Sequence, residues 1–124
     1  MQILIVEDQD AIRSMIETLV SGRGHYVVAV NSGTKAIEIA FGSTPDLVLL
    51  DLHLPGKHDG FAVCEALRAN YTTRRVPIII ISAGDDTAAR TRAMAVGATA
   101  FFGKPFSPTA LLKEVERFGR ATKE

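Results

Sequence analysis

The stretch LVLLD, residues 47–51, decides the fold, because four uninterrupted apolar residues run directly into one aspartate. Three other stretches have the same design: ILIVED at 3–8, IIIIS at 78–82 and AFFGKP at 100–105. Short runs of this kind are typical of strands that are buried on both faces, as in parallel sheets. The carboxyl ends of parallel strands meet at one edge of the sheet, where open α/β sheets bind ligands. We therefore expect the polar residues that end these stretches to form one site.

The order of elements along the chain predicts an α/β domain. Strands are expected at about 2–6, 26–31, 46–51, 77–82 and 99–103, with helical patterns after each. Helices are expected over about 59–70 and 86–96, and Gly97 is expected to end the second of these. Ser32 and Ser107 are expected to cap the N-termini of two other helices. The last helix is expected to point Leu111, Leu112, Val115 and Phe118 inward. Five βα units with right-handed crossovers predict a three-layer, doubly wound, five-stranded parallel sheet with five helices.

Composition limits the classes of function. A chain of 124 residues predicts one domain over 1–124, with no output domain. The balance of 14 basic and 14 acidic residues gives no electrostatic reason to expect nucleic acid or membrane as partners. A single cysteine, Cys64, excludes an internal disulfide, and short apolar runs exclude a signal peptide or a membrane span. These features favour a cytoplasmic protein.

Glu7, Asp8 and Asp51 are expected to bring three negative charges close together at the sheet edge. Such charges repel one another unless a cation neutralises them. Mg²⁺ prefers oxygen ligands and typically binds one or two carboxylates together with phosphate oxygens. With Lys104 included, three carboxylates, one ammonium and one divalent ion sum to zero. The alternatives are that Glu7 and Asp8 only cap a helix and that Asp51 only begins a turn.

Asp51 is the candidate nucleophile of this cluster. A carboxylate that attacks phosphorus forms an acyl phosphate. Phosphoryl transfer needs groups that neutralise charge on the equatorial oxygens, and Lys104 and Ser82 are placed to do this. Because Lys104 precedes Pro105, a cis peptide bond between them is expected to direct the ammonium across the strand ends. His25 and His58 have no metal-ligand spacing and are expected to be solvent-facing loop residues.

Taken together, these motifs resemble the receiver domain of response regulators in two-component signalling, over essentially the whole chain. The resemblance is carried by the acidic pair in ILIVED, the loop DLHLPG at 51–56, the ISA at 81–83 and the KPF at 104–106. It implies a flavodoxin-like sheet in the order 2-1-3-4-5. It also implies phosphotransfer to Asp51 from a phosphohistidine on a histidine kinase or a phosphotransfer protein.

The resemblance further implies a role for each matching residue. Asp8 and Asp51 would bind Mg²⁺ directly, Glu7 would act through water, and the main-chain carbonyl of His53 would complete the metal site. Lys104 and Ser82 would contact the phosphoryl group. Ser82 and Phe101 would then switch the face formed by the fourth helix, the fifth strand and the fifth helix. The protein would be a signalling phosphoacceptor and not an enzyme with a separate substrate, and either a monomer or a weak dimer through the switch face.

Two positions depart from the family pattern. The loop Pro55-Gly56-Lys57-His58-Asp59-Gly60 has one residue more than usual, which we expect the start of the third helix to absorb. Phe101 stands where the family often has tyrosine, so the hydrogen bond of a tyrosine hydroxyl is lost. His53 and Gly84, each two residues beyond a site residue, are expected to flank the path of a hydrolytic water.

Other functions are possible on the same topology. An interaction module could use the switch face without phosphorylation. A flavodoxin-type protein needs a Ser/Thr-rich phosphate loop after the first strand, and a P-loop nucleotidase needs a glycine-rich stretch before Lys-Ser/Thr; neither is present. An aspartyl phosphatase is expected to carry a second carboxylate two residues after its nucleophile, and here that residue is His53.

Overall fold

The computed structural model describes residues 1–83 and 87–123, and side chains as far as residue 118. Its strands are β1 (Gln2–Val6), β2 (Tyr26–Val30), β3 (Leu47–Leu50), β4 (Ile78–Ala83) and β5 (Ala100–Lys104). All pairs are parallel, and the order across the sheet is β2-β1-β3-β4-β5. The predicted strands and their order are thereby confirmed, and Asp51 falls one residue beyond β3.

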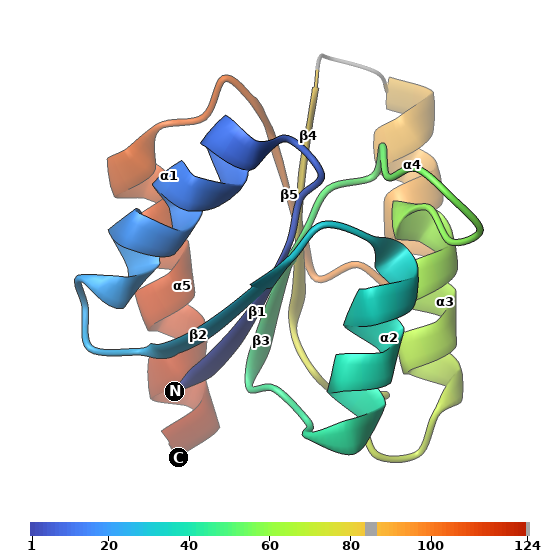
Figure 1. The fold of residues 1–124 in the computed structure, drawn as a ribbon, viewed down its shortest axis with the longest axis horizontal. Helices are drawn as coiled ribbons and strands as arrows, with labels where there is room; N and C mark the ends of the chain where they lie inside the picture. Colours follow the sequence, from blue (N-terminus) through green and yellow to red (C-terminus); the bar gives the residue numbers. More distant parts are fainter. Residues whose placement is uncertain (84–86, 124) are drawn as a thin grey trace.

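Five helices cover the sheet on both faces. They are α1 (Asp10–Ser21), α2 (Gly33–Gly42), α3 (Gly60–Ala69), α4 (Thr87–Ala95) and α5 (Pro108–Lys123). Figure 1 shows α1 and α5 on one side of the sheet and α2, α3 and α4 on the other. The predicted three-layer architecture is therefore confirmed. Gly84 and the predicted helix start at Asp86 lie outside the described residues.

The core consists of two apolar clusters, one on each face of the sheet. Consecutive strand residues alternate between them because side chains of a strand point to opposite faces: Ile3 and Ile5 belong to one cluster, and Leu4 and Val6 to the other. On the α1/α5 face the strands pack against Ile16, Val20, Leu111 and Val115. On the opposite face they pack against Val63, Cys64, Leu67 and Ala93. Because both faces of the sheet are buried, the strand sequences are continuous runs of apolar residues.

The helix ends follow the predicted capping residues. The Ser32 hydroxyl accepts a hydrogen bond from the Lys35 amide, and the Ser107 hydroxyl accepts one from the Ala110 amide. The Asp59 carboxylate caps α3 in the same way through the Ala62 amide at 2.9 Å. Gly97, just after α4, has a φ of +107°, a conformation that costs glycine little.

The predictions for the side chains of Leu112 and His25 are wrong. Leu112 is not part of the core, because it lines an outer groove of α5 with Arg23 and Lys113. His25 is not solvent-facing, since only 10 % of its side chain is exposed. Its ring contacts the amino group of Met1 and the carboxylate of Glu116, each at 3.2 Å. Both contacts depend on how chain segments come together and leave no local pattern.

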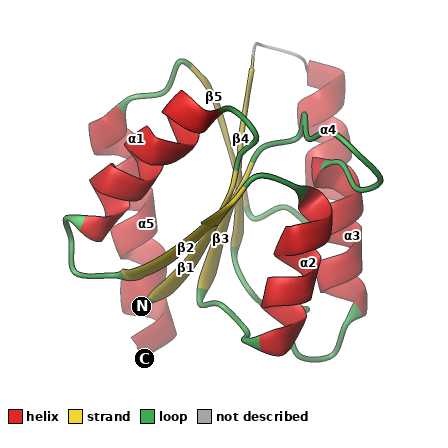
Figure 2. Cartoon of the chain, viewed as in Figure 1, coloured by secondary structure: helices red, strands yellow, loops and turns green. Residues whose placement is uncertain are grey.

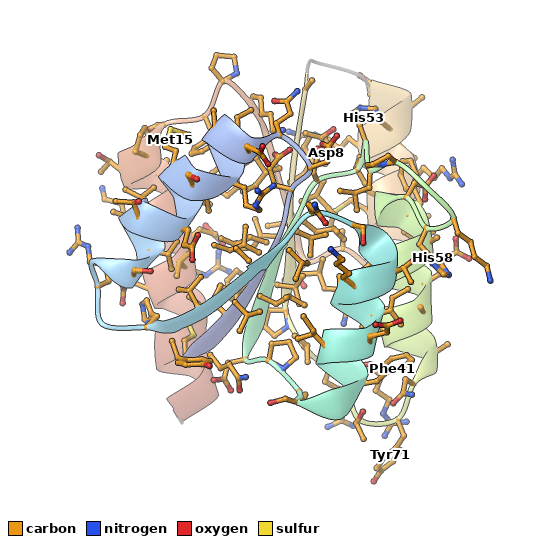
Figure 3. All side chains as sticks on the ribbon, in the orientation of Figure 1. Asp8, Met15, Phe41, His53, His58 and Tyr71 are labelled. Atoms are coloured by element: carbon orange, nitrogen blue, oxygen red, sulfur yellow. The ribbon has the colours of Figure 1, made fainter. Side chains whose placement is uncertain are left out.

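The loops that follow the strands meet at one end of the molecule. Figure 2 shows the connections after β1, β3 and β5 at the same end of the sheet, in green. In Figure 3 the labelled side chains of Asp8 and His53 lie at this end, whereas Phe41 and Tyr71 lie at the other. No helix among the described residues is both long enough and apolar enough to cross a membrane.

Candidate functional site: an acidic cluster with one lysine

Glu7, Asp8 and Asp51 form the cluster that was expected at the sheet edge. Each offers one carboxylate oxygen, and these oxygens lie within 4.8 Å of one another. They come together because β1 and β3 are neighbours: Val6 pairs with Leu50, so the residues that follow are also adjacent. Glu7 and Asp51 are buried, and Asp8 is half-buried. Negative charge is therefore concentrated at this edge of the sheet, where the carboxylates have limited contact with water.

Lys104 supplies the positive charge of the site. Its ammonium Nζ lies 2.6 Å from Glu7 Oε1 and 3.6 Å from Asp51 Oδ2. The peptide bond between Lys104 and Pro105 is cis, as predicted. The second Glu7 oxygen, Oε2, accepts a hydrogen bond from the Gln9 amide at 3.2 Å. Both oxygens of Glu7 are therefore engaged by the protein itself.

The donor set fits Mg²⁺. Ligand oxygens around an octahedral Mg²⁺ with bonds of about 2.1 Å lie roughly 3 to 4.2 Å apart, so small side-chain rotations suffice to bring these carboxylates to one ion. Among the described residues, the Asp8 carboxylate has no hydrogen-bond partner, and it is the most accessible of the three. Asp51 retains one oxygen, Oδ2, that accepts no hydrogen bond and faces the ammonium.

Ser82 carries an unsatisfied hydroxyl next to this cluster. The residue is 1 % exposed, and its Oγ has no hydrogen-bond partner in the structure. A buried hydroxyl without a partner costs about 1–3 kcal/mol. Ser82 lies near the carboxyl end of β4, where it pairs with Gly103 immediately before Lys104. An oxygen-rich ligand at the strand ends would supply the missing partner.

Phe101 and Phe102 point to opposite faces of the sheet, as alternation predicts. Phe101 packs against the α2/α3/α4 cluster and Phe102 against the α1/α5 cluster. The guanidinium of Arg90 in α4 lies 4.9 Å from the centroid of the Phe101 ring, within the range of a cation–π contact. No sequence pattern predicts this pair, because a contact between a helix residue and a strand residue eleven positions further on depends on the packing angle of α4.

The loop between β3 and α3 holds the backbone beside Asp51. The His53 amide donates to Asp51 Oδ1 at 3.2 Å, which orients the carboxylate. His53 itself is exposed. The ring of His58, which was expected to face solvent, is instead half-buried and contacts the Thr34 hydroxyl at 3.0 Å. The longer loop is thus seated against the first turn of α2.

Gly60 brings α3 directly against Asp51, and this contact predicts a stability effect. A Cβ on Gly60 would lie 2.5 Å from both the Asp51 carbonyl oxygen and Leu52 Cα, which are backbone atoms. We expect Gly60→Ala to lower the free energy of unfolding in urea by about 1–3 kcal/mol, because the backbone must shift. Gly42→Ala is the matched control, since nothing lies within 4 Å of its Cβ and it ends a helix. It should leave stability equal or slightly raised; equal losses in both variants would contradict the contact.

Arg13 is a residue of this region that sequence reasoning missed. Its Nη1 donates to the main-chain carbonyls of Glu7 at 3.0 Å and Asp8 at 3.5 Å. Its Nη2 pairs with Asp10 Oδ1 at 2.6 Å. The spacing from Glu7 to Arg13 crosses the boundary from loop to helix, so no periodic pattern reveals the contact.

Comparison with known proteins identifies the family. A model of the response regulator receiver domain matches residues 3–116. The probable transcriptional regulator ycf27 of Guillardia theta is 36 % identical over 121 residues, which are 98 % of this chain and 46 % of that protein. The DNA-binding response regulator MtrA of Mycolicibacterium paratuberculosis is 36 % identical over 114 residues, or 92 % of this chain and 49 % of that protein. The chain thus spans about half the length of these curated relatives.

Solved structures give the same result. The receiver domain of sensor histidine kinase PA1611 from Pseudomonas aeruginosa PAO1, which has a magnesium ion coordinated in its active site cleft, superposes with a TM-score of 0.87 at 31 % identity, covering 94 % of this chain and 95 % of that one. The BeF3-activated N-terminal receiver domain of Klebsiella pneumoniae RstA gives 0.86 at 30 % identity, covering 95 % and 97 %. With a family model matching nearly the whole chain, the protein belongs to the response regulator receiver domains, the phosphoaccepting signalling domains of two-component systems.

Proposed function

We propose that Asp51 is the residue that accepts the phosphoryl group, in a Mg²⁺-dependent reaction with a phosphohistidine donor. The observation that carries this proposal is the cluster of three carboxylates within 4.8 Å, with one ammonium against two of them. The donor would be a histidine kinase or a phosphotransfer protein. The domain would assist chemistry on its own side chain and turn over no separate substrate. A cytoplasmic location is part of the proposal, in keeping with the single free Cys64.

The transfer exchanges one bond to phosphorus for another. Asp51 Oδ2 attacks the phosphorus, a P–O bond forms, the P–N bond to the donor imidazole breaks, and the imidazole nitrogen keeps the electron pair. Asp51 Oδ1 stays held by the His53 amide at 3.2 Å, so the attacking oxygen is oriented. Lys104 and Ser82 would contact the phosphoryl oxygens; this is supported by the 3.6 Å between Lys104 Nζ and Asp51 Oδ2 and by the pairing of Ser82 with Gly103. A bound Mg²⁺ would neutralise charge on those oxygens.

The residues of the proposed metal site differ in whether their oxygens already accept hydrogen bonds from the protein. Asp8, Asp51 and the His53 main-chain carbonyl are the proposed direct ligands. Glu7 is proposed to act through water, because Lys104 holds one of its oxygens and the Gln9 amide the other. Lys104 can thus neutralise Glu7 before transfer and turn toward the new phosphoryl group afterwards.

The proposed output is a change in the face made by α4, β5 and α5. Ser82 would move toward the phosphoryl group and satisfy its buried hydroxyl, and Phe101 would occupy the space it leaves. Support comes from the loose packing of α4, in which only Ala93 is buried among residues 87–95. Its C-terminal end is anchored by two contacts from α3: Arg68 donates to the Gly97 carbonyl and Cys64 to the Val96 carbonyl. Movement is therefore expected at the Thr87 end of the helix.

Incubation with acetyl phosphate tests the proposed function. We expect covalent phosphorylation, read by intact mass, to be lost when Mg²⁺ is replaced with EDTA. The initial rate should fall on the order of 10²-fold or more, since a metal contributes several kcal/mol of charge stabilisation. Labelling that proceeded at an unchanged rate in EDTA would show that the reaction does not require Mg²⁺. Absence of any label, with no Mg²⁺-induced shift of the Asp8 or His53 amide resonances, would favour an interaction module.

A further inference from the structure

Arg13 ties α1 to the loop that carries the acidic residues. It is the fourth residue of α1, and its side chain is 21 % exposed. One guanidinium nitrogen contacts two consecutive loop carbonyls, of Glu7 and Asp8, while the other is paired with Asp10. No contact joins the guanidinium to the carboxylate of Glu7, Asp8 or Asp51 among the described residues. Arg13 therefore acts on the main chain of the cluster.

The loop has few other restraints at this point. Gln9 is the N-cap of α1, and its side chain makes no capping hydrogen bond. The Glu7 amide is bonded to the Val30 carbonyl of β2, which fixes the start of the loop. Beyond it, within the described part of the chain, the Gln9 amide is held only by the Glu7 carboxylate. The two carbonyls held by Arg13 lie between these points, so Arg13 connects the strand end to the helix.

We propose that Arg13 is a positioning residue for the Mg²⁺ site. This inference rests on the proposed function, because it concerns the same cluster. By holding the Glu7 and Asp8 carbonyls, Arg13 fixes the backbone from which the Asp8 carboxylate reaches toward Asp51. Less ordering of the loop then remains to be done when the metal binds. Supporting groups around metal ligands typically contribute 10- to 100-fold to metal affinity.

Charge and positioning make opposite predictions for Arg13. As a cation beside an acidic metal site, Arg13 repels a divalent ion, so its removal on electrostatic grounds alone should tighten Mg²⁺ binding. As an anchor of the ligand loop, its removal should weaken binding. The sign of the change in Mg²⁺ affinity therefore separates the two roles.

The test is a Mg²⁺ titration of the unphosphorylated protein, followed through the Asp8 and His53 amide resonances. We expect Arg13→Met to raise the Mg²⁺ dissociation constant about 10-fold. Arg13→Lys keeps the charge but lacks the planar fork that reaches two carbonyls and Asp10, so it should restore binding only in part. Arg23→Met is the matched control at an exposed position after α1, and its dissociation constant should stay within about 2-fold of wild type or decrease slightly.

Hydrogen exchange of the Gln9 amide provides a second readout. Without Arg13 this amide should exchange faster in the metal-free protein, while the amides of β3 retain wild-type protection. An unchanged or lower Mg²⁺ dissociation constant in folded Arg13→Met would overturn the inference and leave the proposed function intact. If the wild-type protein itself showed no Mg²⁺ response, the proposed function would fail first and this inference with it.

Discussion

We expect an Asp51→Asn variant to keep its fold and lose all Mg²⁺-dependent labelling by acetyl phosphate. The asparagine side chain has nearly the same shape, and its carbonyl oxygen can still accept the hydrogen bond from the His53 amide. It cannot act as the nucleophile, because an amide oxygen carries no full negative charge. Intact mass after incubation with acetyl phosphate and Mg²⁺ gives the measurement.

The same variant should respond differently to Mg²⁺ in unfolding experiments. Wild-type protein should gain about 1.4 kcal/mol when Mg²⁺ is present at roughly ten times its dissociation constant. Asp51→Asn should lose most of this gain. In metal-free buffer it should be equal to or more stable than wild type, since one of three close carboxylate charges is removed.

Asp46→Asn is the control for the loss of a carboxylate. Asp46 lies before β3, where its oxygen accepts a hydrogen bond from the Gln2 amide at 2.7 Å. Asparagine can keep that bond, and labelling should be unchanged. Labelling that persisted in Asp51→Asn would mean that another residue accepts the phosphoryl group.

Replacing Lys104 with methionine should have the largest effect on stability in metal-free buffer. The variant leaves Glu7, whose side chain is only 2 % exposed, without its cation. Breaking a buried ion pair by removing one partner typically costs 3–5 kcal/mol. We expect a value near the lower end, about 3 kcal/mol, because the Gln9 amide still donates to Glu7. Urea unfolding with and without Mg²⁺ is the measurement, and Mg²⁺ should restore part of the loss.

A double-mutant cycle isolates this ion pair. Adding Glu7→Gln to Lys104→Met should recover much of the stability, because the second variant removes the charge that was left unpaired. Lys113→Met, at an exposed position of α5, should change stability by no more than about 0.5 kcal/mol. A loss in Lys104→Met as small as that of Lys113→Met would show that the Glu7–Lys104 contact contributes little.

Local sequence patterns are enough to predict the strands of the sheet and the residues of the candidate site. The apolar runs predict strands because each residue of β3 is buried, whichever face it points to. The polar residues that end these runs converge because parallel register carries them to one edge. Strand order required the family resemblance, since five similar apolar runs do not by themselves say which is next to which.

The contacts inside the site could not be predicted from sequence. The family resemblance implies that Lys104 contacts the phosphoryl group. In the structure its Nζ pairs with Glu7 Oε1 at 2.6 Å. Arg13 binds loop carbonyls, which every residue has, so no residue type signals the contact. The prediction for His25 is wrong because its ring contacts Glu116 of α5, 91 residues further along the chain. The prediction for Leu112 is wrong because the face of α5 that packs on the sheet is set by tertiary packing.

The pair joins Glu7, which directly follows β1, with Lys104, the last residue of β5, 97 positions further on. In the sheet β1 and β5 are separated by β3 and β4. The pair can form only after β5 has docked, so it belongs to the last steps of assembly. A growing polypeptide that has emerged through β4 already contains all three carboxylates but not their lysine. Completion of the sheet therefore also brings in the ammonium that offsets part of the negative charge at the acidic edge, and a chain cut short before β5 would lack that charge.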